Sequence, residues 1–387
     1  MKALDFAPVK TILQSAITAG IPAAQLVVRW RGNEVLNLTA GWLDPDTRRR
    51  PTQPDTLFDI ASITKLFTSL AFMTLVEKGA LALDRPVGAV LPQFNGNRPI
   101  QPYEDPLNPG QMVTVAGADG AVDAGSVTFR HLLTHTSGLP AWRPLCEQPD
   151  AKAARRMALE TFFSYPPGTR VVYSDIGLIL LGMAIEQASG QGLEEAVHQR
   201  VIAPLNLRHT RYFPLSPPGG EPGGGNVAPT EFCPWRGRRI TGQVHDENAY
   251  QLGGVAGHAG LFSTAADLAA LGQVLLDRKN KSGNHSDLPL RAETVSEMTR
   301  LQTAGLDSRR GLAFMLWQPD PESSGNPFSQ RAFGHTGFTG ASLWIDPDRD
   351  LVVALLTNEV YNGRQNRKIQ ALRIGTHKAI MNVLRDL

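Results

Sequence analysis

Residues 58–67 read FDIASITKLF and place a serine, two spacer residues and a lysine at the front of a long apolar run. Because residues three apart share one face of a helix, a helix that begins near Ser62 presents Ser62 and Lys65 to the same cavity. A serine hydroxyl becomes a nucleophile when a base removes its proton, and lysine serves where burial or nearby cations lower its pKa. The stretch therefore indicates an acyl-transfer site, although S-x-x-K alone is more often a helix cap followed by a solvated lysine.

Two later stretches carry the same kind of chemistry. VVYSDIGLILLG places Tyr173 and Asp175 just ahead of an apolar helix, and FGHTGFTG places His335 on a predicted strand. Taken singly, Tyr173 fits a core aromatic residue and His335 an ordinary strand histidine. The residues after Lys65, LFTSLAFMTLV, make its helix apolar on several faces, so a lysine there needs a reason.

The order S-x-x-K, Y-S-[ND], [KH]-T-G resembles the motif set of serine β-lactamases and penicillin-binding proteins. With its tyrosine, the second motif resembles that of the class C β-lactamase branch. This branch includes family VIII esterases and D-alanyl-D-alanine peptidases. LLTHTSGLP at 132–140 and GGVAGHAGLFSTAADLA at 253–269 look like further signatures of that family. The resemblance extends over nearly the whole chain.

The resemblance implies a role for each matching residue. Ser62 would be the nucleophile and Lys65 its partner base, and Tyr173 would relay protons in acylation and deacylation. His335 takes the place that lysine usually holds in the third motif. As His335 can titrate, recognition of a substrate carboxylate would depend on pH near neutrality.

The same resemblance assigns the residues around the substrate. Thr336 and Gly337 would line the strand edge, and Trp142 would line the acyl pocket. The backbone N–H groups of Ser62 and Phe338 would form the oxyanion hole, in which each donor commonly contributes about 2.7–4 kcal/mol.

Two features bear on the substrate. Many family members have asparagine where this chain has Asp175, and an ionised aspartate cannot donate a hydrogen bond to a substrate amide. We therefore expect Asp175 to hold Lys65 or another cation, which favours esterase or peptidase-like activity over β-lactam hydrolysis. In the segment 242–260, His245 and His258 either line the substrate cleft or satisfy loop backbone groups.

The fold class expected is α/β plus all-α. Strand-like segments lie at both chain ends (residues 23–42 and 331–360) and helical spacing fills the middle, which predicts an antiparallel sheet built from both termini and flanked by helices. We expect a sheet domain of residues 1–80 and 285–387 and an inserted helical domain of residues 81–284. Polar, Pro- and Gly-rich residues predict long loops at 92–127 and 214–250.

Composition restricts the partners. The chain has 387 residues, of which 42% are apolar, with 38 Lys+Arg against 36 Asp+Glu, so nothing favours nucleic acid or an anionic membrane. The chain contains no uninterrupted run of about 18 apolar residues, so we expect no membrane span. The N-terminal stretch lacks the apolar region of a signal peptide, so we expect a cytoplasmic protein, or a periplasmic or secreted one if a leader was removed.

Other site types fit less well. His131 and His135 are four apart, but HLLTH lacks the glutamate of H-E-x-x-H, so we expect neither a catalytic metal nor another cofactor. No G-x-S-x-G occurs, which argues against an α/β-hydrolase. The expected function is a serine acyl hydrolase acting on esters or cell-wall peptide amides. A true class C-like β-lactamase and a catalytically weak penicillin-binding module remain alternatives. The oligomeric state and a bridge between Cys146 and Cys233 stay open.

Overall fold

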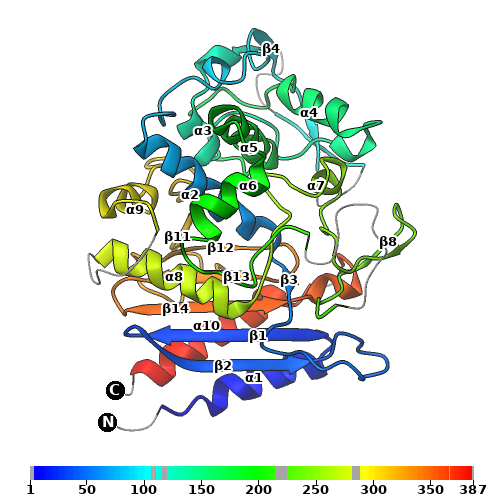
Figure 1. Ribbon diagram of the computed structural model, residues 1–387, viewed down its shortest axis with the longest axis vertical. Helices are drawn as coiled ribbons and strands as arrows, with labels where there is room; N and C mark the ends of the chain where they lie inside the picture. Colours follow the sequence, from blue (N-terminus) through cyan, green and yellow to red (C-terminus); the bar gives the residue numbers. More distant parts are fainter. Residues whose placement is uncertain are drawn as a thin grey trace.

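The computed structural model describes residues 4–105, 108, 110–115, 120–213, 225–280, 288–365 and 367–385. One antiparallel sheet has six strands in the order β11-β12-β13-β14-β1-β2. Figure 1 shows α1 and α10 on one side of this sheet, and α8 with the remaining helices on the other. The strands of this sheet are β1 (Ala23–Trp30), β2 (Asn33–Gly41), β11 (Met315–Leu316), β12 (Phe333–Thr336), β13 (Ser342–Asp346) and β14 (Leu351–Thr357).

The two chain ends meet in the middle of the sheet. β1 pairs antiparallel with β14, with Leu26 opposite Leu355. β1 turns into β2 through Arg31 and Gly32, both at positive φ, as a two-residue hairpin requires. The predicted fold class, with an antiparallel sheet built from both termini, is confirmed.

The sheet is covered on both faces, which explains why its central strands are apolar throughout. Every residue of β14 is buried. Val352 and Leu356 join the core that contains α8, whereas Val353 and Leu355 join the core that contains α1 and α10. A strand that is buried on both faces does not alternate apolar with polar residues, and the sequence of β14, LVVALLT, is apolar in all but its last residue.

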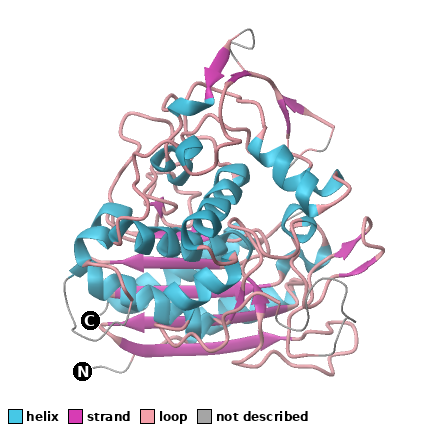
Figure 2. Ribbon diagram, turned by 45° about the horizontal axis from the view of Figure 1, so that its top comes forward, coloured by secondary structure: helices cyan, strands magenta, loops and turns pink. Residues whose placement is uncertain are grey.

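Helices lie beside the strands of the large sheet, as Figure 2 shows in a second view, and most of them come from the middle of the chain. The helix α2 (Thr64–Glu77) is buried from Thr64 to Leu75 and packs against α5 (Asp175–Ser189). The other α-helices are α1 (Ala7–Thr18), α3 (Phe129–Leu133), α4 (Ala151–Leu159), α6 (Leu193–Val197), α7 (Glu247–Gln251), α8 (Ala265–Asn280), α9 (Ala292–Met298) and α10 (Ile369–Arg385).

The sequence-based division assigns α8 to the inserted domain, but α8 packs on β1, β13 and β14 of the sheet. Gly272 allows this close approach, because a Cβ there would lie 2.5 Å from Val352. The two-domain boundary itself stays a prediction.

The predicted loop 92–127 contains regular structure in its described part. β4 (Asn97–Pro99) pairs with β7 (Ala121–Asp123), and β5 (Tyr103–Glu104) pairs with β6 (Met112–Val113). Arg98 anchors the first pair, since its buried guanidinium donates to the carbonyls of Thr161 (3.0 Å) and Gln93 (3.1 Å). Such long-range anchors cannot be read from local composition.

The second predicted loop, 214–250, is described only from residue 225 on, so most of SPPGGEPGGG lies outside the described residues. Its described part contains β8 (Phe232–Cys233), paired with β9 (Arg238–Arg239), and the start of α7. Cys146 and Cys233 are both free thiols. Among the described residues, no helix has the length and apolar character needed to cross a membrane.

A buried histidine couples this fold to pH. His377 on α10 is fully buried, and its Nδ1–H donates to the Ser324 carbonyl at 2.7 Å. Burial lowers the pKa of His377 to about 4. Because the unfolded chain binds this proton near its ordinary pKa of about 6.5, the contribution of neutral His377 is complete above that pH and is lost as pH falls toward 4.

We therefore expect the free energy of unfolding to fall between about pH 6.5 and 4, with His377 contributing about 1.4 kcal/mol per pH unit. Urea denaturation of the wild type and His377→Asn at several pH values measures this slope. The variant should lose stability less steeply on acidification. Equal slopes in the two proteins would contradict the burial of a neutral His377.

Candidate active site

The turn before α2 presents Ser62 directly after a strained residue, Ala61. Ser62 lies in a 3-10 turn, Ala61–Ile63, and Ala61 has φ +45°, a conformation that costs an alanine of order 1–3 kcal/mol. The buried Asp59 carboxylate accepts the N–H groups of Ala61 (2.8 Å) and His245 (2.7 Å). These bonds fix the turn that presents Ser62, and the predicted helix start is correct to within two residues.

Lys65 is completely buried, and its ammonium has three partners. Nζ lies 2.7 Å from Ser62 Oγ, 2.8 Å from Asp175 Oδ1 and 3.1 Å from the His258 carbonyl. Burial alone would lower the pKa of Lys65, but the Asp175 carboxylate and the Tyr173 hydroxyl outweigh it, so the pKa is raised. Lys65 is bonded to Asp175, as the sequence led us to expect, and this carboxylate supplies the charge that offsets burial.

Tyr173 lies beside Lys65 and between two histidines. Its ring centroid is 4.8 Å from Lys65 Nζ, 4.6 Å from the His135 ring and 6.0 Å from the His335 ring. Burial raises the pKa of Tyr173, although Lys65 lowers it in part, so the resting hydroxyl is protonated.

The loop 134–141 positions the Tyr-Ser-Asp segment. Ser174 donates its N–H to His135 Nδ1 (3.1 Å) and its hydroxyl to the Pro140 carbonyl (2.6 Å). The N–H of Asp175 donates to the Ala141 carbonyl at 3.0 Å. Because its Nδ1 accepts a bond, neutral His135 carries its proton on Nε2, and burial, followed by the charge of Arg310, lowers the pKa of His135.

His335 on β12 is buried and neutral. Its Nδ1–H donates to the Thr336 carbonyl at 2.7 Å, which leaves Nε2 as an acceptor. Burial, with the charges of Lys65 and Arg310, holds the pKa of His335 well below its ordinary value. His335 therefore adds no cation near neutral pH, contrary to the expected pH-dependent recognition of a carboxylate.

Gly337 brings β12 against the nucleophile turn, because a Cβ at this position would lie 2.4 Å from the Ile60 carbonyl oxygen. The next residue, Phe338, stacks on the His245 ring (5.6 Å, 20°) and lies under Arg367 (4.3 Å). Thr336 is half-buried on the same strand. These contacts place the backbone of the third predicted motif beside the turn that contains Ser62.

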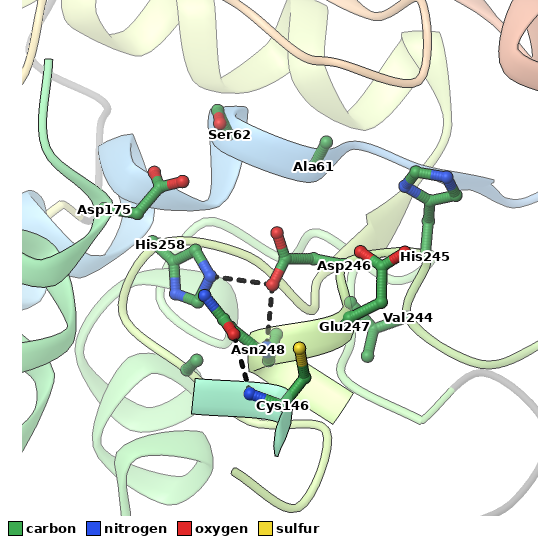
Figure 3. A network of polar contacts seen from close by, with 12 residues as sticks. Ala61, Ser62, Cys146, Asp175, Val244, His245, Asp246, Glu247, Asn248 and His258 are labelled. Atoms are coloured by element: carbon green, nitrogen blue, oxygen red, sulfur yellow. Dashed lines mark hydrogen bonds and ion pairs between the residues drawn. The ribbon is translucent and has the colours of Figure 1, made fainter. Parts of the chain in front are cut away.

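The remaining predicted residues differ in environment. His245 and His258 are buried, and each is bonded to a carboxylate, His245 to Glu231 (2.7 Å) and His258 to Asp246 (2.9 Å). Figure 3 shows His258 and Asp246 between Asp175 and the α7 segment. Their proposed contact with substrate stays a prediction. Trp142 is half-buried, and its place in an acyl pocket likewise stays a prediction.

One group in the described part of the chain has metal-ligand spacing. Ligand atoms of Asp175, Asp246 and His258 lie within 4.8 Å of one another. However, Lys65 already neutralises Asp175 at 2.8 Å, and His258 Nε2 already bonds Asp246. A divalent ion here would face the Lys65 ammonium at short range, so the cluster fits an ion-pair network better than a metal site.

Comparison with known proteins gives the family. The family model described as Beta-lactamase matches residues 9–376. The chain belongs to the β-lactamase family. It is 32% identical over 382 residues to an N-acetylmuramyl-L-alanine amidase of Bacillus subtilis (strain 168), covering 91% of this chain and 80% of that protein. It is 31% identical over 334 residues to a putative D-alanyl-D-alanine carboxypeptidase of Escherichia coli (strain K12), and the match covers 79% of this chain and 70% of that protein.

Solved structures of β-lactamase-like proteins share the fold. EstCE1, a hydrolase with promiscuous acyltransferase activity, aligns with a TM-score of 0.69 at 22% identity over 96% of this chain and 97% of its own. A penicillin-binding protein homologue from Caulobacter crescentus aligns with a TM-score of 0.69 at 20% identity, and the match covers 98% of this chain and 97% of that one. The resemblance inferred from the sequence is confirmed.

Asp175 should control the pH at which Ser62 becomes reactive. In the wild type, we expect the rate of labelling by a fluorophosphonate to rise with pH, because Lys65 must lose a proton to accept one from Ser62. In Asp175→Asn, the carboxylate that raises the pKa of Lys65 is gone, so the midpoint should move to lower pH.

Gel-based labelling rates over a range of pH measure the two midpoints. Asp348→Asn, in the turn between β13 and β14, serves as the control and should keep the wild-type midpoint. If Asp175→Asn also keeps it, Asp175 does not set the protonation of this site.

Proposed function

We propose that this protein is a serine acyl hydrolase that cleaves cell-wall peptide amides or related esters through an acyl-enzyme on Ser62. The observation that carries the proposal is the 2.7 Å approach of Ser62 Oγ to a fully buried Lys65 Nζ, with the Tyr173 ring 4.8 Å from the same nitrogen. A nucleophile within hydrogen-bond distance of a base that a third group orients is the arrangement that covalent catalysis requires.

In the proposed cycle, Lys65 and Tyr173 act together as one general acid–base pair. After the pair loses one proton, it accepts the Ser62 proton as Oγ attacks the substrate carbonyl carbon. Tyr173 then returns a proton to the departing nitrogen or oxygen, and the acyl group stays on Ser62 as an ester. Water attacks this ester, the pair takes the water proton, and the acid leaves as Ser62 regains its hydrogen.

The oxyanion of both steps needs fixed donors. We propose the N–H groups of Ser62 and Phe338, since Gly337 brings β12 within close contact of Ile60, immediately before the nucleophile turn. The stacking of Phe338 on His245 and its contact with Arg367 hold this backbone in place. Preorganised donors of this kind cost no rearrangement during the reaction.

The relatives support a cell-wall substrate. One is named an amidase of N-acetylmuramyl-L-alanine and another a putative D-alanyl-D-alanine carboxypeptidase, and both act by name on peptidoglycan-type amides. Asp175 disfavours the β-lactamase alternative, because its carboxylate is committed to Lys65 and cannot donate to a β-lactam side-chain amide. The cytoplasmic location expected from the sequence stays a prediction.

A substrate panel tests the proposal. N-acetylmuramyl-L-alanine, an acyl-D-Ala-D-Ala peptide, p-nitrophenyl acetate and nitrocefin are incubated with enzyme, and the products are read by mass spectrometry. We expect hydrolysis of at least one amide and of the ester, with slow turnover of nitrocefin. Nitrocefin as the best substrate would favour the β-lactamase alternative, and no turnover of any compound would favour a binding module.

Variants test the assigned roles. Lys65→Ala and Tyr173→Phe should each lower kcat/KM for the ester by at least about 10²-fold, as expected for positioned acid–base groups. Tyr361→Phe is a matched control, because its ring packs under Arg239 (3.6 Å), and it should retain wild-type rates. Near-normal rates for Tyr173→Phe would remove Tyr173 from the mechanism.

A further inference from the structure

Arg373 on α10 is a buried cation that the proposed mechanism does not use. Its Nη2 donates both of its hydrogens, to the Gly337 carbonyl at 2.9 Å and to the Ala341 carbonyl at 2.6 Å. These two residues lie at the ends of one tight turn after β12, since the Gly337 N–H donates to the Ala341 carbonyl at 2.7 Å. Arg373 therefore closes this turn from the side of the sheet that α10 covers.

The charge of Arg373 is not cancelled by an ion pair in the described part of the chain. Burial lowers the pKa of Arg373 to about 9, which leaves the guanidinium charged at neutral pH. Glu359, the acid that opposes this shift, bonds to Arg367 at 2.9 Å instead. The buried Nε of Arg373 has no hydrogen-bond partner among the described residues. The acceptors that offset the burial of this charge are therefore backbone carbonyls.

One of these carbonyls belongs to the peptide that carries a proposed oxyanion donor. The Gly337 carbonyl and the Phe338 N–H are the two ends of a single peptide group. A trans peptide points its C=O and its N–H in opposite directions, so the Phe338 N–H points away from Arg373. Because α10 and α2 lie on opposite sides of the sheet (Figure 1), this N–H points toward the side that holds Ser62. Among the described residues no backbone carbonyl accepts it, which leaves it available to a substrate.

A cation at the carbonyl end of a peptide strengthens the donor at the other end. Hydrogen bonds to a charged group are about twice as strong as neutral ones, and bonds in series polarise one another by about 10–30% per bond. The Gly337 carbonyl also accepts the Gly340 N–H at 3.1 Å, so two donors draw electron density from one oxygen. Resonance within the peptide transmits this polarisation to the nitrogen, which makes the Phe338 N–H a better donor.

The same turn is joined to the turn that presents Ser62. The Thr339 hydroxyl donates to the Asp59 carbonyl at 2.6 Å, and the Asp59 carboxylate accepts the Ala61 N–H at 2.8 Å. Arg367 binds the Phe338 carbonyl. The two proposed oxyanion donors thus lie on turns that are connected through Asp59, as a preorganised pair requires.

We propose that Arg373 is a positioning residue that polarises the Gly337–Phe338 peptide and so strengthens one donor of the oxyanion hole. This inference rests on the proposed function, in which an oxyanion forms on the substrate carbonyl in both steps. Arg373 acts through this peptide and not by contact with the substrate. Its effect is therefore expected on kcat, which reflects the charge that develops in the transition state, and not on KM.

The polarisation can be observed at a single peptide. The sequence contains one Gly-Phe pair, Gly337–Phe338, so glycine labelled with ¹³C at its carbonyl and phenylalanine labelled with ¹⁵N give one coupled NMR signal. In Arg373→Gln, which removes the charge and keeps an amide donor, the carbonyl carbon should move upfield. The matched control is Arg98→Gln, because Arg98 is also buried and donates to backbone carbonyls, and it should leave the signal in place. An unchanged signal in Arg373→Gln would overturn the proposal.

Hydrolysis of p-nitrophenyl acetate measures the consequence for the reaction. Loss of a whole oxyanion donor costs about 10²–10³ in kcat, and a weakened donor should cost less. Arg373→Gln should therefore lower kcat about 10-fold and change KM less than about threefold. Arg373→Lys keeps the charge and should lower kcat less than about threefold. Arg98→Gln should keep the wild-type kcat.

A purely structural role would give other results. Equal losses of kcat in Arg373→Gln and Arg373→Lys, or a loss carried by KM, would overturn the proposal. If Arg373→Gln does not fold, Arg373→Lys decides alone, because the carbonyl signal and kcat must change together or stay together. A shifted signal with the wild-type kcat, or the wild-type signal with a kcat lowered more than about 10-fold, would contradict the role of Arg373.

Ser62→Ala separates this proposal from the proposed function. If Ser62→Ala hydrolyses the ester as fast as the wild type, the proposed function fails, whatever the NMR signal shows. If hydrolysis depends on Ser62 but Arg373→Gln keeps the wild-type kcat, only the role of Arg373 fails.

Discussion

The buried Lys65 ammonium is the interaction on which the rest of the site depends. Removing an ammonium from water costs several kcal/mol unless its donors are satisfied, and Lys65 is fully buried. Its three partners come from three separate parts of the chain: Ser62 beside it, Asp175 at the start of α5, and the carbonyl of His258. Satisfying this one charge therefore fixes the relative positions of α2, α5 and the segment before β10.

Close backbone contacts make this arrangement possible. Gly257 lies against α5, where a Cβ would be 2.0 Å from the Leu178 carbonyl oxygen, and this brings the His258 carbonyl to Lys65. Gly138 approaches the Tyr165 carbonyl equally closely, in the loop that clamps Ser174. The glycines of the family signatures thus have a steric reason, because any larger residue would separate the segments that meet around Lys65.

The motifs predicted much of the fold and the centre of the site from sequence. Ser62, Lys65 and Tyr173 do lie together, because short patterns on helix starts report local geometry that the fold preserves. The sequence predicted that Asp175, which is 110 residues away in the chain, holds Lys65, but it did not predict the net rise of the pKa of Lys65 or the fall of the pKa of His335 on burial. Arg310 stands in no motif, and its position 5.4 Å from the Tyr173 ring centroid follows only from the fold.

The central claim is that Ser62 carries the acyl group. The most direct measurement is to quench the enzyme with acid during turnover of an activated ester and to map the added acyl mass by peptide mass spectrometry. The account predicts the acyl mass on the peptide that contains Ser62, and its accumulation in a variant slowed in deacylation. Turnover with no acyl mass on any peptide, or with the mass on another side chain, would contradict it.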